Sequence, residues 1–266
     1  MTKKVIVGAL LSVLVLVLAT TVSAGPTMDR ILKSGELVIG TSGKQPPMTA
    51  ISKKGEIIGL DADIARAMAA AFELKIKFKI LPFADLLPAL EAGKVDMILS
   101  SMAITPMRNR KVVFVGPYLV SGKGILTLSD RYAALQQATG LNAPEVSVAA
   151  LKDSTSQEYT ETLMPKAKLI SIDSYDQGID LLLKRKVDVV VADYPFCALT
   201  AYRYQDKGLL AGKAPLSFEP LGIAMPEDTL LVNWVQNFLV LLQGNGQLPE
   251  MQKKWLTGGK WVEALP

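Results

Sequence analysis

The chain has no histidine among its 266 residues and only one cysteine, Cys197. The lack of histidine excludes catalysis by a Ser-His-Asp triad or a Cys-His pair, and it removes the commonest protein ligand of metal ions. Zinc catalysis is therefore not expected, and no metal or cofactor is predicted. A single cysteine cannot form a disulfide within the chain, so the fold must rest on its hydrophobic core.

A strong excess of positive charge is also missing. The 29 Lys and Arg residues face 25 Asp and Glu residues, and leaving out Lys3 and Lys4 reduces the basic residues to 27. The basic residues form no cluster along the chain. Nucleic acid is therefore not expected as a partner.

The N-terminus has the three parts of a secretory signal peptide. Lys3 and Lys4 precede an apolar run over residues 5–18, and Val22-Ser23-Ala24 is a small-residue cleavage site. The run is shorter than the roughly 20 residues of a membrane span, although an uncleaved anchor is the alternative. We expect a signal peptide over residues 1–24 and a mature chain of residues 25–266. No cysteine lies near the cleavage site, so a lipid anchor is not expected and a periplasmic location is favoured.

Short apolar strands alternate with amphipathic helices along the mature chain, which is typical of α/β folds. Its length suits one large domain or two small ones. Strands are predicted at residues 36–41, 74–80, 95–99, 146–150, 169–172 and 187–192, and helices at 61–72, 84–92, 157–164, 176–184, 230–242 and 248–255.

One pattern occurs twice. Residues 90–101 and 182–193 each read as a helix end, a Lys-Val-Asp turn and an apolar strand. Ser101 and Asp193 are the fifth residues after the respective aspartates, just past the carboxyl end of a strand, where open α/β sheets place ligands. Two lobes built on one plan would bring these ends together across a cleft, unless the two segments resemble each other by chance.

Residues 100–108 (SSMAITPMR) form a candidate anion site. Thr105 is predicted to cap a short helix and Pro106 to be its first residue, which places Arg108 in the first turn. A cation is unfavourable there unless an anion joins it, and a guanidinium matches a carboxylate best. The alternative is a solvated surface arginine.

Three further segments are candidates for the same cleft. Residues 153–158 (DSTSQE) open a helix, with Thr155 and Glu158 at capping-box spacing, and they offer hydroxyl and amide donors or only a cap. Asp193 precedes a helix, where it starts that helix or receives an ammonium group. The loop 40–48 follows the first strand. Together these segments could pair with both charges of a zwitterion. A closed cleft must do so, because a buried charge without a partner is costly.

The mature chain resembles the extracytoplasmic solute-binding proteins that serve polar amino-acid ABC transporters. The resemblance covers residues 25–266 and rests on several motifs in the order and spacing of that family, with the strand 187–193 as a further mark. The motifs are Pro46-Pro47, residues 59–65 (GLDADIA), 93–96 (GKVD), 104–108 (ITPMR) and 116–118 (GPY).

This resemblance implies an α/β fold of the two-lobed periplasmic-binding-protein type II class, with two crossing hinge strands and closure on the ligand. The crossings are expected near residues 118–123 and 216–221. Lobe one is expected to comprise residues 25–119 and 222–266, and lobe two residues 120–221.

The resemblance also implies a ligand site. Arg108 is expected to clamp the α-carboxylate of an amino acid. Assistance is expected from Ser101 and the backbone at Ala103 in lobe one, and from Ser154 and Thr155 in lobe two.

At the other end of the ligand, the family pattern assigns the α-ammonium to Asp193 and to the backbone carbonyl of Ser100. Phe83 matches an aromatic residue that packs on the ligand. Tyr118 is expected near the hinge and the cleft.

The chain departs from the family pattern at several positions. Ala103 replaces a common hydroxyl residue, and Asp153 replaces a glycine and adds negative charge beside the carboxylate site. Gln45 replaces an aromatic residue, and Ser42 stands where members that bind basic amino acids tend to have aspartate. Lysine or arginine is therefore less favoured as the ligand, and Lys44 with Gln45 favours a polar or acidic side chain.

The leading hypothesis is a monomeric, non-enzymatic receptor that delivers a polar amino acid to the membrane permease of an ABC importer. An enzyme similar to cyclohexadienyl dehydratases, which act on prephenate or arogenate, is the alternative, with Asp153 or Glu158 as general acid. A sensor module is a third alternative, which would be accompanied by a downstream membrane span and signalling domain.

Overall fold

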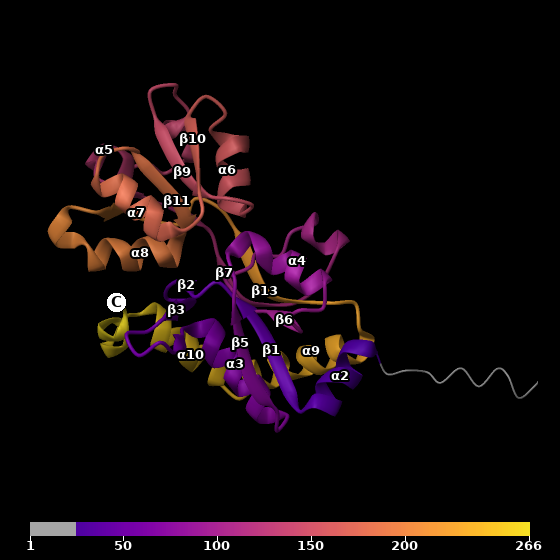
Figure 1. Cartoon of the computed structure of the whole chain (residues 1–266). Helices are drawn as coiled ribbons and strands as arrows, with labels where there is room; N and C mark the ends of the chain where they lie inside the picture. Colours follow the sequence, from indigo (N-terminus) through magenta and orange to yellow (C-terminus); the bar gives the residue numbers. More distant parts are fainter. Residues whose placement is uncertain (1–24) are drawn as a thin grey trace, which may run out of the picture.

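The computed structural model describes residues 25–266 and shows two lobes, each built around a five-stranded sheet (Figure 1). The predicted signal peptide lies outside the described residues. Within them, no helix is both long and apolar enough to cross a membrane.

Lobe one contains the sheet β5-β1-β6-β13-β7, in which β1 is parallel to β5 and β6, and β13 is antiparallel to β6 and β7. Its strands are β1 (Glu36–Thr41), β5 (Lys75–Ile80), β6 (Met97–Ile98), β7 (Val113–Ser121) and β13 (Glu219–Met225), and a small second sheet holds β2 (Lys44–Gln45), β3 (Thr49–Ile51) and β4 (Ile57–Ile58). Its helices are α2 (Pro26–Ser34), α3 (Leu60–Ala71), α4 (Leu86–Glu91), α9 (Thr229–Gly244) and α10 (Gln247–Leu256), with 3-10 turns η1 (Phe83–Asp85), η2 (Arg108–Arg110) and η5 (Lys260–Ala264).

Lobe two contains the sheet β10-β9-β11-β8-β12. Its strands are β8 (Lys123–Thr127), β9 (Ser147–Leu151), β10 (Lys168–Ile172), β11 (Val189–Asp193) and β12 (Leu210–Ala211). Its helices are α5 (Asp130–Ala133), α6 (Thr155–Leu163), α7 (Tyr175–Leu183) and α8 (Tyr194–Arg203), with 3-10 turns η3 (Ala138–Leu141) and η4 (Gln205–Lys207).

Both sheets follow one plan, as the repeated pattern suggested. In lobe one, Asp96 Oδ2 accepts a hydrogen bond from Val38 N at 2.8 Å, and β6 follows it beside β1. In lobe two, Asp188 Oδ2 accepts from Ser147 N, also at 2.8 Å, and β11 follows it beside β9. The two Lys-Val-Asp turns therefore fix equivalent strands, and the resemblance between them is structural rather than accidental.

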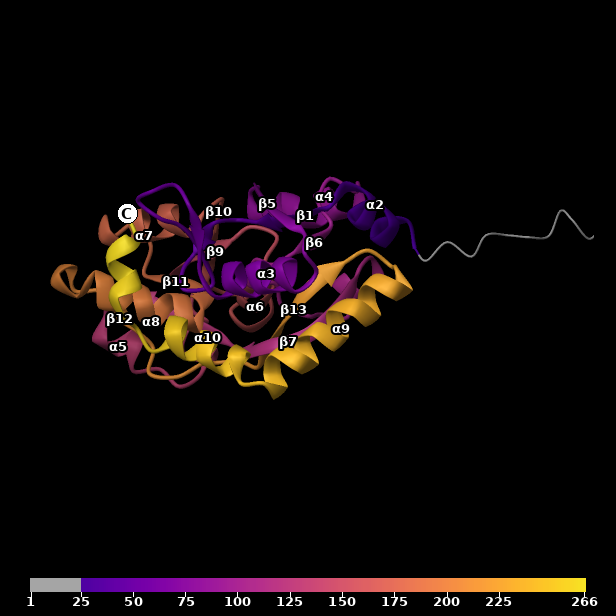
Figure 2. The ribbon, with the colours of Figure 1, turned by 90° about the horizontal axis from the view of Figure 1, so that it is seen from below.

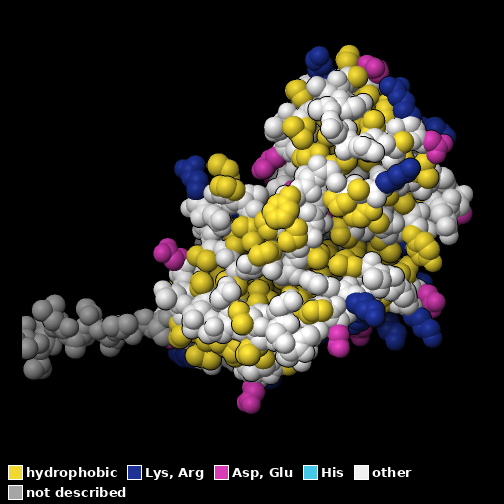
Figure 3. Space-filling view, turned by 180° about the vertical axis from the view of Figure 1, so that it is seen from behind, with side chains coloured by type: hydrophobic (Ala, Val, Ile, Leu, Met, Phe, Trp, Pro, Cys, Tyr) yellow, Lys and Arg dark blue, Asp and Glu magenta, His cyan; other side chains and the backbone are white. Residues whose placement is uncertain are grey.

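Two strands connect the lobes. The chain leaves lobe one along β7 and enters β8 after Gly122 alone, while β13 returns antiparallel to β7, with Glu219 opposite Ser121. Gly122 has no room for a side chain, because a Cβ there would lie 1.9 Å from the carbonyl oxygen of Ser217. Seen from behind, hydrophobic side chains spread across the middle of the molecule, between the upper and lower lobes (Figure 3).

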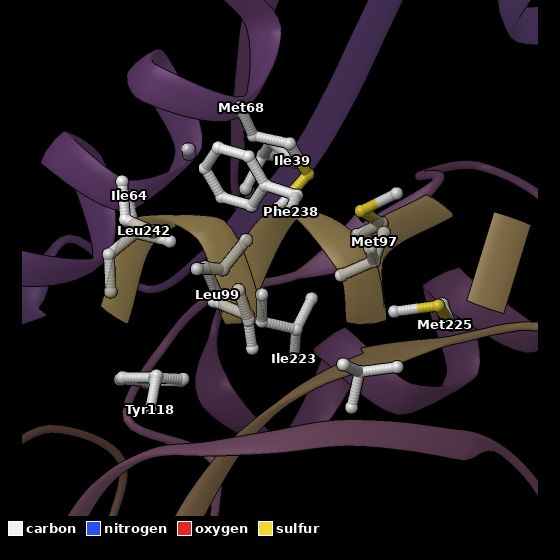
Figure 4. Close-up of a cluster of buried hydrophobic side chains, with 14 of the residues drawn as sticks. Ile39, Ile64, Met68, Met97, Leu99, Tyr118, Ile223, Met225, Phe238 and Leu242 are labelled. Atoms are coloured by element: carbon white, nitrogen blue, oxygen red, sulfur yellow. The ribbon is translucent and has the colours of Figure 1, made fainter. Parts of the chain in front are cut away.

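The core of lobe one lies between its sheet and the helices α3 and α9 (Figure 4). Helix α9 packs against β7 of the β7–β13 pair (Figure 2). Lobe two has its own buried layer, which includes the strand residues Val189 and Val191. The single cysteine, Cys197, is fully buried in α8.

Candidate functional site

A small polar cavity of about 10 Å³ lies between the lobes. An amino acid is larger than this cavity, so the lobes must separate to admit one. The cavity is lined by Gln45, Phe83, Ser101, Arg108, Lys123, Leu151, Ser154, Thr155, Tyr175 and Asp193.

Arg108 is buried in lobe one, with 8 % of its surface exposed. The Thr105 hydroxyl accepts a hydrogen bond from Arg108 N at 3.2 Å, as expected of a cap. The helix is only the 3-10 turn η2, however, and it begins at Arg108 and not at Pro106 as predicted. The guanidinium donates to the carbonyl oxygen of Ala103 at 2.9 Å and lies over the Phe83 ring, 5.8 Å from its centroid. Burial lowers the pKa of Arg108, against the opposing influence of Glu158 and other carboxylates. Arg108 is therefore a positioned, partly desolvated cation rather than a solvated surface residue.

The start of α6 faces Arg108 from lobe two. Ser154, not Thr155, caps the helix: its hydroxyl accepts from Ser156 N and Gln157 N, and donates to the carbonyl oxygen of Leu151 at 2.6 Å. The predicted capping box is therefore one residue out of register, and this leaves Thr155 beside the cavity. Asp153 is exposed and absent from the cavity lining, so its charge is solvated.

Asp193 ends β11 and is 4 % exposed. Its Oδ1 accepts a hydrogen bond from Lys123 Nζ at 2.7 Å. Its Oδ2 accepts from Ser101 Oγ at 2.9 Å and from Gln45 Nε2. Ser101 and Asp193, which occupy equivalent places in the repeated pattern, thus meet across the lobe boundary.

Sequence reasoning missed two charged residues here, Lys123 and Glu219. Lys123 is 2 % exposed, and its Nζ lies 2.7 Å from both Asp193 Oδ1 and Glu219 Oε2. Burial lowers the pKa of Lys123, but the two carboxylates more than offset this and leave the pKa raised. Burial also raises the pKa of Glu219, against the influence of Lys123. The available signal was a lysine at the head of the apolar segment 123–127.

Tyr118 does not line the cavity. It is 1 % exposed, and its hydroxyl donates to Asp61 Oδ1 at 2.8 Å. Asp61 Oδ2 accepts from the backbone N of Ser101 at 2.7 Å. Tyr118 therefore reaches the site only through Asp61, which fixes Ser101 in its left-handed backbone conformation (φ 52°).

Three other predicted residues also lie outside the cavity lining. Ser100 Oγ accepts from Ser42 N at 3.0 Å and donates to the Ser42 hydroxyl, which fixes the end of β1 against the end of β6. Ala103 holds Arg108 through its carbonyl and forms a bridge to Leu221. Ser42 lines a neighbouring compartment.

That compartment has a volume of about 360 Å³ and shares Gln45, Phe83, Leu151 and Tyr175 with the polar cavity. Ile80, Leu81 and Pro82 make much of its remaining wall apolar, while Lys44 and Asp173 bring one charge from each lobe. The small polar cavity therefore adjoins a larger compartment.

A separate crevice of about 680 Å³ lies between α8 and the C-terminal segment, and its lining includes Tyr194, Tyr202, Trp255, Trp261 and Glu263.

Comparison with known proteins agrees with this architecture. Residues 37–258 match the family model of bacterial extracellular solute-binding proteins, family 3. The chain is 27 % identical over 220 residues to ABC transporter arginine-binding protein 1 of Escherichia coli (81 % of this chain, 88 % of the relative). It is 23 % identical over 255 residues to cyclohexadienyl dehydratase of Pseudomonas aeruginosa (94 % of each chain).

Among solved structures, a binding component of an ABC transporter from Wolinella succinogenes, complexed with lysine, superposes with a TM-score of 0.82 at 30 % identity (86 % of this chain, 99 % of that chain). The type II periplasmic-binding-protein fold expected from the sequence is confirmed. The match to the family model spans most of the chain, and the chain therefore belongs to the bacterial extracellular solute-binding proteins, family 3.

Proposed function

We propose that this protein is an extracytoplasmic receptor that binds an amino acid between its lobes and delivers it to the permease of an ABC importer. The observation that carries the proposal is the cavity itself, where a buried cation from lobe one and a buried carboxylate from lobe two face the same space. The names of the relatives, which include arginine- and glutamine-binding proteins, support it.

In this proposal Arg108 binds the α-carboxylate. Thr155 donates to it from lobe two, and Ser101 assists from lobe one. Asp193 serves the α-ammonium, because its carboxylate can accept further hydrogen bonds. Charge-assisted hydrogen bonds contribute about 1.5–3 kcal/mol each, so a few of them suffice for micromolar affinity, about 8 kcal/mol.

Closure follows from the same contacts. The ligand bridges residues of both lobes, so it binds the closed form better and shifts the population toward that form. The strands β7 and β13 are the hinge in this proposal, with residues 25–119 and 222–266 as lobe one and 120–221 as lobe two. The permease then recognises the closed monomer in the periplasm, after removal of residues 1–24.

The ligand side chain would occupy the larger compartment. Ser42 and Lys44 from lobe one, together with Asp173 from lobe two, give its boundary a polar character, whereas Ile80 and Leu81 make much of its wall apolar. A polar side chain with an apolar stem matches this lining.

We propose receptor activity without catalysis. The dehydratase alternative assigned the general acid to Asp153 or Glu158, but both are exposed and neither lines the cavity. A general acid must reach the proton acceptor of the bound substrate, and neither side chain reaches the cavity. Formation of an aromatic product from prephenate would contradict this proposal.

The test is a thermal-shift panel of the twenty amino acids and prephenate on protein that has been unfolded and refolded to strip bound ligand. Ligand at 100 times its Kd adds about 2.7 kcal/mol of stability, which gives a clear shift. Arg108→Ala should abolish the shift, while Arg110→Ala, an exposed residue of the same turn, should leave it intact. A panel in which no amino acid shifts the melting temperature would refute the proposal.

A further inference from the structure

The Asp193 carboxylate is already served by donors from the protein. Oδ1 accepts from the Lys123 ammonium at 2.7 Å, and Oδ2 accepts from Ser101 Oγ and Gln45 Nε2. A ligand ammonium that approaches Asp193 therefore meets a carboxylate that already contacts a cation, which it shares with Glu219. The contact between the ligand ammonium and Asp193 is therefore an addition to the existing contact between Asp193 and Lys123.

Lys123 is built into this position. It is 2 % exposed and follows Gly122 at the crossing between the lobes, where a second carboxylate, Glu219, lies 2.7 Å from its Nζ. A buried ammonium between two carboxylates stays charged, since each favours the protonated form. The immediate surroundings of the cavity thus contain two cations, Arg108 and Lys123, and two carboxylates, Asp193 and Glu219.

The contact between Lys123 and Asp193 affects which ligands the site can exclude. A buried carboxylate that relied on the ligand for its cation would be left unpaired by a ligand without an amino group, and such a loss is costly. Sites built in that way reject the incomplete analogue by about 10⁴-fold or more. At Asp193 this penalty is reduced, because Lys123 remains in contact whichever ligand enters.

We propose that the Lys123 ammonium takes the place of a ligand α-ammonium at Asp193, so that the site accepts α-carboxylic acids without an amino group, such as 2-hydroxy and 2-oxo acids, as well as amino acids. The inference rests on the proposed function, because it assumes that Arg108 binds an α-carboxylate in this cavity. It makes Lys123 a determinant of ligand class.

The experiment compares Kd values by titration calorimetry for the amino acid that gives the largest thermal shift and for its 2-hydroxy counterpart, for example arginine and argininic acid. In the native protein the two values should lie within about tenfold of each other. The charge-neutral variant Lys123→Met/Glu219→Gln leaves Asp193 without its cation. In that variant the amino acid should bind at least about 100-fold more tightly than the 2-hydroxy acid.

The matched control is Lys111→Met/Glu91→Gln, which removes an ion pair of 3.5 Å on the exposed surface of lobe one and should leave the ratio unchanged. Circular dichroism checks that each variant folds. If the Met/Gln variant does not fold, Lys123→Gln/Glu219→Gln tests the same change, because it keeps a donor near Asp193 and removes the charge.

The outcomes separate the two proposals. A native protein that prefers the amino acid by more than about 100-fold overturns the inference and leaves the receptor function standing. A ratio that is equally small in both proteins also overturns it, since Lys123 would then not be the cause. Binding of the 2-hydroxy acid alone overturns both proposals, because the inference requires similar affinities for the two ligands and the proposed function requires an amino-acid ligand. Binding of neither ligand class overturns both as well.

Discussion

Asp61 is the residue whose ionisation should be visible in the stability of the protein. Burial raises its pKa from 3.8 to about 7, against the lowering effect of hydrogen bonds from Tyr118 and Ser101. Between pH 4 and 7 the folded state therefore keeps a proton that the unfolded state has lost. The contribution of Asp61 to the free energy of unfolding is therefore largest below this window, falls as the pH rises through it, and levels off above pH 7. The contribution is as much as about 4 kcal/mol.

The variant Asp61→Asn should remove this decline. Urea unfolding at pH 5 and pH 8 measures it, and the quantity to compare is the pH-dependent change in the free energy of unfolding of the variant against the native protein. Asp85→Asn, an exposed carboxylate of η1, is the control. Equal pH dependence in all three proteins would show that Asp61 does not titrate in this range.

Only part of the residue-scale site could be predicted from the sequence. Thr105, Pro106 and Arg108 form a local signal, because a cap, a first-turn proline and an unfavourably placed cation lie within four residues. Asp193 could be found through its equivalent position to Ser101. Lys123 and Glu219 could not be paired in advance, since they lie 96 residues apart and meet only because β7 and β13 cross side by side.

At the scale of the elements, one carboxylate caps two helices of lobe one. Asp228 precedes α9, and its Oδ1 accepts from Leu231 N at 3.1 Å. Its Oδ2 accepts from Thr27 N at 3.1 Å and Met28 N at 2.9 Å, at the start of α2. The two helix N-termini therefore share one anion, and its negative charge interacts favourably with both helix dipoles.

Asp228→Ala should destabilise the protein by about 2–4 kcal/mol, because single caps contribute about 0.5–2 kcal/mol and three N–H groups, two of them buried, lose their acceptor. Chemical denaturation measures the effect. Ser174→Ala is the comparison, since Ser174 caps α7 alone and should cost about 1 kcal/mol. A smaller loss for Asp228→Ala than for Ser174→Ala would contradict the shared cap.

The predicted elements agree closely with the structure where the apolar period is long. The strand 36–41 is found with these bounds, and α3, α7, α9 and α10 lie within two residues of their predicted ends. The strand 95–99 is shorter, because only Met97–Ile98 pair within the sheet. The order of the strands within each sheet could not be predicted. Strand β13 belongs to the sheet of lobe one although it follows all the strands of lobe two in the sequence.

At the scale of the whole molecule, two hydrogen bonds cross the cleft to Asp193, one from Gln45 and one from Ser101. The double variant Gln45→Ala/Ser101→Ala removes both lobe-one donors. We expect its equilibrium to shift toward separated lobes, with a larger radius of gyration in small-angle X-ray scattering. Amino-acid binding should weaken by about tenfold or more, since each 1.4 kcal/mol lost from the closed form is a factor of ten.

Lys94→Ala, an exposed change in lobe one away from the cleft, is the control for this variant. An unchanged radius of gyration and affinity in the double variant would mean that the two contacts do not hold the lobes together. A change in radius without a change in affinity would separate lobe closure from binding.

The burial of Cys197 has a practical consequence for measuring such motions. Burial raises the pKa of this thiol well above its ordinary value, so the chain's single cysteine is poorly reactive toward maleimide dyes. The native protein should therefore be labelled very little by such dyes. Cysteines introduced at Tyr202 on lobe two and Glu263 on lobe one, on opposite walls of the crevice beside the C-terminal segment, would carry a donor and an acceptor fluorophore. The receptor could then be read out as an optical sensor of its own ligand.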